Sequence, residues 1–165
     1  MRIGLYGMPT AGKTFIMDRI DFIEVYAGSK LLRDCDPLFD SRDEEGREKA
    51  RKAVASLMMG KNNFIMDGHY AFGDETAFTD DDGEMYDAFV YLYIAPATLR
   101  TRMASSEKNR KYLRYDVGEW QNREISGLRE YCHSHNKDFY DFLTVHMPDW
   151  QERKKQLDYE FVLGI

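Results

Sequence analysis

The chain alternates between short apolar runs and longer amphipathic stretches. Apolar runs rich in β-branched and aromatic residues, bounded by glycine, proline or polar residues, predict strands at residues 2–6, 22–26, 63–67, 88–95 and 142–146. Helical periodicity and end signals predict helices at about 13–20, from 30 onward, 43–59, 97–104, 119–135 and 149–161. Strands that alternate with helices predict a three-layer α/β fold with a mostly parallel sheet of about five strands.

Composition limits the class of protein. With 165 residues, 43% of them hydrophobic, the chain is large enough for one core, so we expect a single domain over residues 1–165. No apolar run reaches the length of a membrane span, and glycines interrupt the N-terminal segment before a signal-type core, so we expect a cytoplasmic protein. The net charge of −6 argues against a protein that coats DNA or RNA. Cys35 and Cys132 lack metal-site spacing and fit free thiols.

A phosphate-binding motif follows the first predicted strand. The segment Gly7-Met8-Pro9-Thr10-Ala11-Gly12-Lys13-Thr14 satisfies GxxxxGK[ST] and precedes a predicted helix. Glycines let successive backbone N–H groups point inward at phosphate oxygens. Lys13 would reach the β- and γ-phosphates of ATP, and Thr14 would bind Mg²⁺. The alternative is a chance glycine turn with a surface lysine, which the complete motif and its context disfavour.

A carboxylate at the end of the third predicted strand completes the expected magnesium site. Asp67 follows a buried apolar run, where a second magnesium ligand of a P-loop protein is expected. The alternative is a turn-forming aspartate before Gly68. His69 comes next, beside the expected γ-phosphate, and its possible roles are to contact phosphate, to orient an acceptor, or to pack.

Four segments, in this order, resemble the adenylate-kinase-like nucleoside and nucleotide kinases of the P-loop NTPase class. They are residues 7–14, 28–33 (GSKLLR), 65–68 (IMDG), and the fourth predicted strand with residues 96–102 (PATLRTR). The resemblance covers most of the chain, although only the P-loop is highly specific alone. It implies that Arg33 binds the acceptor, that Asp67 supports magnesium and acceptor binding, and that Arg102 opens a mobile lid.

The chain also departs from that family. Adenylate kinases follow Asp-Gly with Phe-Pro-Arg, whereas here His69-Tyr70-Ala71 stands in that place, and the usual Thr-Gly-Asp before the arginine at position 33 is replaced by Gly-Ser-Lys. An arginine that would contact an acceptor phosphate is therefore missing, which argues against AMP. We expect another small molecule, a nucleoside, nucleotide or related metabolite, bound with the help of Arg33, His69 and Tyr70.

Charge is segregated along the chain. Residues 100–123 are rich in arginine and lysine, and we place the lid at about 105–123. Arg102, Arg110 and Arg114 are candidates for stabilising the charge on the transferred phosphoryl group. The alternative for this basic segment is a solvated helix face. Residues 74–87 are strongly acidic and predict a solvated loop, which would favour a neutral or amine-bearing acceptor if it flanked the acceptor site.

These observations favour a kinase that transfers a phosphoryl group from ATP, with Mg²⁺, to a small-molecule acceptor. Lys13, Asp67 and Arg102 are the expected catalytic residues. The competing interpretation is a P-loop ATPase that acts as a switch or assembly factor, with water as the acceptor. A kinase must recognise a second substrate, so the two hypotheses differ in whether an acceptor site exists.

Overall fold

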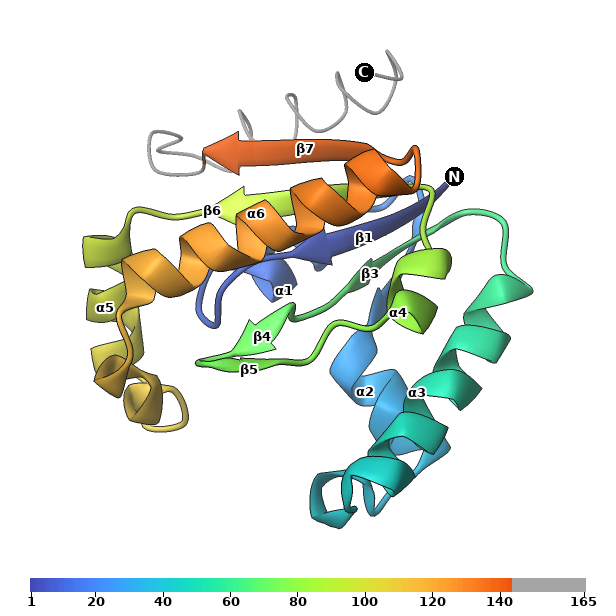
Figure 1. Ribbon diagram of the computed structural model, residues 1–165, viewed down its shortest axis with the longest axis horizontal. Coiled ribbons are helices and arrows are strands. Elements are labelled where there is room, and N and C mark those ends of the chain that lie inside the picture. Colours follow the sequence, from blue (N-terminus) through green and yellow to red (C-terminus); the bar gives the residue numbers. More distant parts are fainter. Residues whose placement is uncertain (144–165) are drawn as a thin grey trace.

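The computed structural model describes residues 1–143 and has one main sheet with helices around it (Figure 1). The main sheet contains five strands: β1 (Arg2–Tyr6), β2 (Glu24–Ala27), β3 (Phe64–Asp67), β6 (Ala88–Tyr93) and β7 (Asp138–Leu143). Their spatial order is β2-β3-β1-β6-β7, and every neighbouring pair is parallel. The predicted α/β fold with a parallel sheet of about five strands is confirmed.

Helices connect the strands, as parallel pairing requires. They are α1 (Lys13–Met17), α2 (Gly28–Cys35), α3 (Glu44–Met59), α4 (Asp80–Glu84), α5 (Pro96–Ala104) and α6 (Val117–Ser134), with 3-10 turns η1 (Phe39–Ser41) and η2 (Arg110–Arg114). Figure 1 shows α6 crossing in front of the sheet and α1 behind it, while α2 and α3 project together from one side. None of the helices within residues 1–143 is long and apolar enough to cross a membrane.

Side chains that alternate along the strands form two hydrophobic clusters. Ile3 and Leu5 of β1 belong to a mainly aliphatic cluster with Val90 of β6. The next residue of β1, Tyr6, belongs to an aromatic cluster with Phe89 of β6. Because successive side chains of a strand point to opposite faces, each buried strand supplies both clusters. This explains why the central strands are almost continuously apolar in sequence.

Several predicted boundaries differ from the structure. The helix expected at 13–20 ends at Met17, and the fourth strand ends at Tyr93 because the next helix already begins at Pro96, a residue suited to a first helical position. The fifth strand was predicted wrongly: it begins at Asp138 and pairs along β6, whereas the apolar run suggested a start at position 142. The rest of that run, residues 144–146, and the helix predicted at 149–161 lie outside the described residues.

The acidic segment was also predicted wrongly, because part of it is ordered secondary structure. A two-stranded antiparallel sheet, β4 (Ala71–Phe72) and β5 (Glu75–Thr76), precedes α4. Thr79 and Asp82 form a capping box at the start of α4, in which each side chain binds the other residue's backbone N–H. Local capping therefore stabilises a helix where charge alone suggested a solvated loop.

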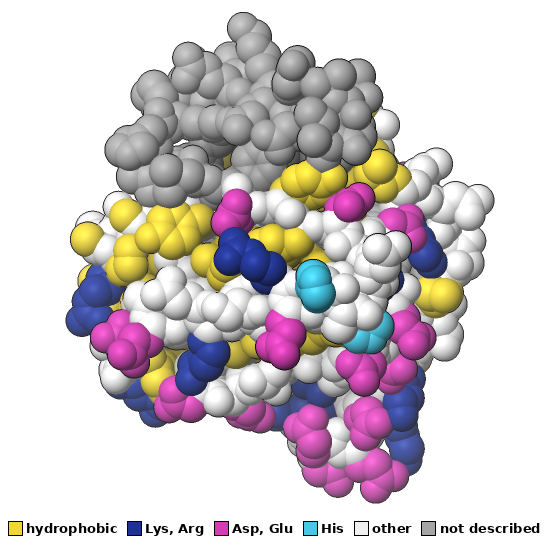
Figure 2. Space-filling view, turned by 45° about the horizontal axis from the view of Figure 1, so that its top comes forward, with side chains coloured by type: hydrophobic (Ala, Val, Ile, Leu, Met, Phe, Trp, Pro, Cys, Tyr) yellow, Lys and Arg dark blue, Asp and Glu magenta, His cyan; other side chains and the backbone are white. Residues whose placement is uncertain are grey.

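The projecting pair of α2 and α3 carries many charged side chains of both signs (Figure 2). Ion pairs such as Lys49–Glu45, at 2.7 Å, link successive turns of α3. Asp43 caps this helix by accepting a hydrogen bond from the backbone of Gly46 at 2.9 Å. The predicted helix at 43–59 is confirmed almost to the residue, because its capping signal and its charge pattern are both local.

Candidate active site

The segment between β1 and α1 adopts a conformation that depends on its glycines. Gly7 and Gly12 have φ angles of +151° and +101°, and Thr10 lies in the left-handed region at +68°. A side chain on Gly7 would also place its Cβ 3.0 Å from the carbonyl oxygen of Leu92. Left-handed backbone is unfavourable for most residues with a side chain. The motif therefore forms a tight loop between a strand and a helix, as the sequence predicted.

Lys13 points into this loop. Its side chain is 6% exposed, and Nζ donates hydrogen bonds to the carbonyl oxygens of Gly7 at 2.5 Å and Met8 at 3.3 Å. Burial lowers the pKa of Lys13 from 10.5 to about 8, while the carboxylates of Asp67 and Glu124 oppose that shift. The ammonium group thus remains charged at neutral pH in a poorly hydrated position, where it would attract phosphate strongly.

Asp67 lies at the carboxyl end of β3, next to the strand that leads into the loop. It is paired in register with Leu5 of β1, and its Oδ1 accepts a hydrogen bond from the backbone of Gly28 at 2.9 Å. Gly68 follows, and a Cβ there would lie 2.8 Å from the ring of Tyr6. This close packing leaves little freedom to the backbone beside Asp67, whose carboxylate is held by the N–H of Gly28 at the start of α2.

Thr14 and Asp67 offer the oxygen ligands that magnesium prefers. Thr14 is exposed in the first turn of α1, and a hydroxyl and a carboxylate are suitable ligands for this hard cation. Within residues 1–143 there is no group of three or more histidine, cysteine or acidic side chains that would hold a metal by itself. The residues present therefore fit a magnesium ion bound mainly through nucleotide phosphates, with few protein ligands.

Of the three candidate arginines after β6, only Arg102 contacts the P-loop. Its Nη1 donates to the carbonyl oxygens of Thr10 at 3.2 Å and Ala11 at 3.5 Å. Arg110 instead donates to the carbonyl of Ala104 at the end of α5. Arg114 donates to the hydroxyl of Tyr115 at 2.6 Å and stacks over its ring. Arg110 and Arg114 thus lie within the segment predicted as the lid, and their role toward ATP stays a prediction. The lid itself and the single domain over residues 1–165 also stay predictions.

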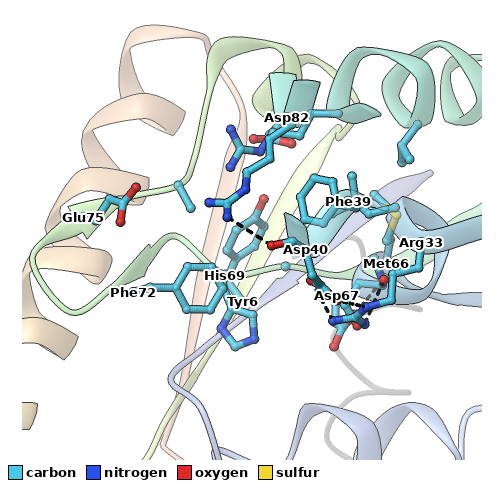
Figure 3. Close-up of a pocket in the computed structure, with 18 of the residues that line it drawn as sticks. Tyr6, Arg33, Phe39, Asp40, Met66, Asp67, His69, Phe72, Glu75 and Asp82 are labelled. Carbon is cyan, nitrogen blue, oxygen red and sulfur yellow. Dashed lines mark hydrogen bonds and ion pairs between the residues drawn. The ribbon is translucent and has the colours of Figure 1, made fainter. Parts of the chain in front are cut away.

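A cavity of about 410 Å³ opens beside Asp67, between α2, α3, the β4–β5 hairpin and η2 (Figure 3). Its volume suits a small metabolite. Its lining combines aromatic rings with charged side chains of both signs, among them Tyr6, Arg33, Phe39, Asp40, Arg47, Arg51, Asp67, His69, Phe72, Glu75, Asp82, Tyr86, Lys111 and Tyr112.

Three arginines from α2 and α3 line the cavity. Arg33 is held by Asp40 through two hydrogen bonds, Nε to Oδ2 at 2.9 Å and Nη2 to Oδ1 at 3.3 Å. Arg47 donates to the carbonyl of Asp40 at 3.4 Å, while its buried Nε has no hydrogen-bond partner among the described residues. Arg51 is 18% exposed and pairs with Glu44 at 3.0 Å. Arg33 was predicted from the sequence, whereas Arg47 and Arg51 were not, although their spacing of four residues places both on one face of α3.

The acidic segment does reach the cavity, through Glu75 and Asp82. Burial raises the pKa of Asp82, which the hydrogen bonds from Thr79 and the charge of Arg51 partly offset. Three arginines and Lys111 line the same cavity and carry the opposite charge. The acidic segment therefore contributes to a cavity that is lined by both signs of charge, and the preference for a neutral or amine-bearing acceptor stays a prediction.

The residues after Asp67 separate into one that lines the cavity and one that does not. His69 lines it, and its ring centroid lies 4.9 Å from that of Phe72. Its buried Nδ1 has no hydrogen-bond partner within residues 1–143. Burial, with the charges of Lys13 and Lys108, lowers the pKa of His69 well below its usual value. Tyr70 instead stacks on Phe78 at 5.3 Å within the core, outside the cavity lining. The structure thus brings Arg33 and His69, but not Tyr70, to the cavity.

A buried glutamate supports this region. Glu124 of α6 is fully buried and accepts hydrogen bonds from Trp120 Nε1 at 3.0 Å, the backbone N–H of Ala71 at 3.2 Å and the hydroxyl of Tyr91 at 2.6 Å. Burial raises the pKa of Glu124, although its three donors and Lys13 favour the charged form. Its bond to Ala71 fixes the chain just after His69 and Tyr70. Sequence analysis missed it, since a glutamate in an amphipathic helix resembles a surface residue.

Comparisons with known proteins find similarity in structure alone. No family model matches the sequence, and no curated protein does. A shikimate kinase from Acinetobacter baumannii in complex with shikimate matches with a TM-score of 0.64 and 16% identity over 99% of this chain and 93% of that chain. The shikimate kinase of Aquifex aeolicus matches with a TM-score of 0.64 and 17% identity over the whole of both chains. The shikimate kinase of Bacteroides thetaiotaomicron matches with a TM-score of 0.62 and 20% identity over 100% of this chain and 99% of that chain. The fold of this chain is therefore that of the P-loop small-molecule kinases.

Proposed function

We propose that this protein transfers the γ-phosphoryl group of ATP to a small molecule bound in the cavity between α2, α3 and the β4–β5 hairpin. The observation that carries the proposal is the combination of a formed P-loop, with Lys13 buried inside it, and a separate cavity that begins at Asp67. One site suits a nucleoside triphosphate, and the other has the size and polarity for a second substrate.

The P-loop and its neighbours would bind the donor. Backbone N–H groups of residues 10–14 would surround the β- and γ-phosphates, and Lys13 would exchange its bonds to loop carbonyls for bonds to phosphate oxygens. Arg102, which donates to a carbonyl of the loop, would stabilise charge on the transferred group. Arg110 and Arg114 would approach the nucleotide when the segment around η2 closes, which would also exclude water.

Thr14 and Asp67 would hold magnesium together with the phosphates. When bound, the ion neutralises phosphate charge and orients the γ-phosphoryl group. Asp67 also lines the cavity, so its carboxylate would lie between the proposed donor and acceptor sites. In the transfer, an acceptor oxygen forms a bond to the γ-phosphorus while the bond from that phosphorus to the β,γ-bridging oxygen breaks, and ADP leaves.

The cavity also bears on the competing hypothesis of a switch ATPase. Hydrolysis needs only water at the γ-phosphate, and a cavity of about 410 Å³ lined by three arginines and several aromatic rings has no role in that reaction. The structural neighbours give a first compound to test, since one of them contains shikimate. Arg33 and His69 are the proposed acceptor-binding residues, and a cytoplasmic location fits such a metabolic role.

The test follows the label of γ-labelled ATP in the presence of Mg²⁺. The protein is incubated with shikimate, gluconate, nucleosides or nucleoside monophosphates, and transfer to each compound is compared with release of inorganic phosphate. Transfer that is lost in Lys13→Met and retained in Lys49→Met, which alters an exposed lysine, supports the kinase. Release of phosphate that no compound accelerates or redirects contradicts it and favours the switch.

A further inference from the structure

An ion pair lies inside the cavity. The guanidinium of Arg33 in α2 donates to both carboxylate oxygens of Asp40, which lies seven residues further along the chain in η1. Both side chains line the cavity, and dashed lines join them in Figure 3. The residue to which we assign acceptor binding is therefore already occupied by a carboxylate of the protein itself.

This ion pair is open to solvent and easily separated. The side chain of Arg33 is 48% exposed and that of Asp40 is 69% exposed. Such an exposed pair contributes little to stability, because water hydrates both charges when they part. Arg33 also donates from Nη1 to the carbonyl of Ser29, one turn earlier in its own helix, at 3.2 Å. The guanidinium therefore has a second contact that persists when another anion takes the place of Asp40.

The surroundings of the Asp40 carboxylate are cationic. It is the one carboxylate that the segment from α2 to α3 contributes to the cavity lining, whereas Arg33, Arg47 and Arg51 come from the same segment. Arg47 donates to the backbone carbonyl of Asp40 and to no carboxylate of the described residues. Hydrogen bonds from Arg33 lower the pKa of this carboxyl group, and so do the charges of Arg47 and Lys108. Asp40 thus lies where an anionic group of a bound molecule would be strongly attracted.

The fold of this segment does not depend on the Asp40 carboxylate. Among the described residues that carboxylate accepts hydrogen bonds from Arg33 alone. The turn before η1 is held instead by Asp36, whose Oδ1 accepts from the backbone N–H of Leu38 at 3.0 Å. Asp36 also pairs with Arg42, Nε to Oδ2 at 2.7 Å, and neither of these two residues lines the cavity. The Asp36–Arg42 pair thus has the same chemistry as the pair in the cavity, but it lies outside the cavity.

We infer that Asp40 is a specificity-determining residue, whose carboxylate is the counter-ion of Arg33 in the free protein and is displaced by an acidic group of the acceptor. This inference rests on the proposed kinase function. A carboxylate or a phosphate group offers two oxygens to the guanidinium and replaces both hydrogen bonds. An uncharged acceptor leaves the ion pair intact. Competition with Asp40 therefore weakens the binding of an acidic acceptor, and a group that does not displace Asp40 gains nothing from Arg33.

Asp40→Asn tests this competition, because it removes the charge and keeps the size of the side chain. Binding to the protein with saturating ADP and Mg²⁺ is measured by calorimetry for carboxylates (shikimate, gluconate), phosphates (AMP, CMP) and an uncharged compound (thymidine). For the acidic compound that binds most tightly, the Kd is expected to fall about fivefold in the variant. The KM for the same compound in label transfer should fall equally, without a loss of kcat. Asp36→Asn, the matched control, should leave both constants unchanged.

A double-mutant cycle identifies the partner of Asp40, since Asp40→Asn should lose most of its effect in an Arg33→Ala background. A gain that persists there in full overturns the inference. So does an unchanged or higher Kd in Asp40→Asn, or an equal gain in Asp36→Asn or for thymidine.

These results leave the kinase function standing if the native protein transfers the label. Transfer to thymidine by a protein that binds none of the acidic compounds overturns the inference about Asp40 alone. Transfer to none of the compounds, in a protein that binds ATP, overturns the proposed function and this inference with it.

Discussion

Replacing Lys13 by methionine should remove ATP binding and at the same time stabilise the free protein at neutral pH. Methionine has a similar length and no charge, so it fills the same space within the loop. Among residues 1–143, the Lys13 ammonium donates hydrogen bonds to the carbonyl oxygens of Gly7 and Met8 and to no other group. A binding site that presents a buried cation to an anionic ligand is expected to be destabilising until the ligand arrives.

The size of the expected change in stability follows from the pKa of Lys13. Its fall from 10.5 to about 8 corresponds to about 3 kcal/mol of destabilisation of the charged form in the folded state. Against this, the variant loses the two hydrogen bonds to loop carbonyls, at about 1 kcal/mol each. Lys13→Met should therefore be more stable than the native protein by about 1 kcal/mol at pH 7.

The pH dependence follows from the same pKa. Below about pH 8 Lys13 is charged in both the folded and the unfolded protein, and the folded state bears the full penalty. Between about pH 8 and 10.5 the folded protein releases this proton before the unfolded chain does, so the penalty disappears as pH rises. The native protein should thus gain about 3 kcal/mol relative to Lys13→Met across that interval.

Urea unfolding followed by circular dichroism measures both stabilities at pH 7 and at intervals up to pH 10, and calorimetric titration measures ATP binding. The difference in unfolding free energy between the two proteins cancels the titration of all other groups. Lys49→Met, at an exposed position of α3, is the control for a lysine-to-methionine change. The reasoning is refuted if Lys13→Met is clearly less stable at pH 7, or if the difference does not change with pH. Native ATP affinity in the variant would refute the P-loop assignment.

Four further substitutions test other parts of the site. Asp67→Asn keeps an acceptor for the Gly28 N–H but loses the anionic oxygen, so the Mg²⁺ concentration for half-maximal activity should rise about tenfold; an unchanged requirement contradicts the magnesium role. Arg33→Ala should raise the acceptor KM with little effect on ATP, whereas Arg102→Ala should mainly lower kcat, and steady-state kinetics showing the reverse would exchange their roles. Glu124→Ala removes three buried hydrogen bonds and should lower the free energy of unfolding, measured by urea titration, by about 3 kcal/mol. Glu130→Ala, exposed on the same helix, should change it little, and equal effects of the two substitutions would show that the buried network does not stabilise the fold.

The sequence by itself determined the parts of this protein that depend on neighbouring residues. The P-loop required only glycines at positions of unusual φ, a lysine and a threonine at fixed spacing, and the structure forms that loop. The long helix α3 was predicted because its end signals are local, with acidic residues at its start and Gly60 directly behind it. The buried strands were found because a run of apolar residues is needed for burial on both faces.

Tertiary structure decided which side chains meet. Arg47, Arg51 and Glu124 have ordinary polar sequence contexts, and only the packing of α3 and α6 against the sheet directs them into a cavity or a buried network. Tyr70 and His69 are adjacent in sequence, yet one stacks in the core and the other lines the cavity, because the chain turns between β3 and β4. Local patterns fix backbone conformation, whereas the surroundings of a side chain depend on segments far away in the sequence.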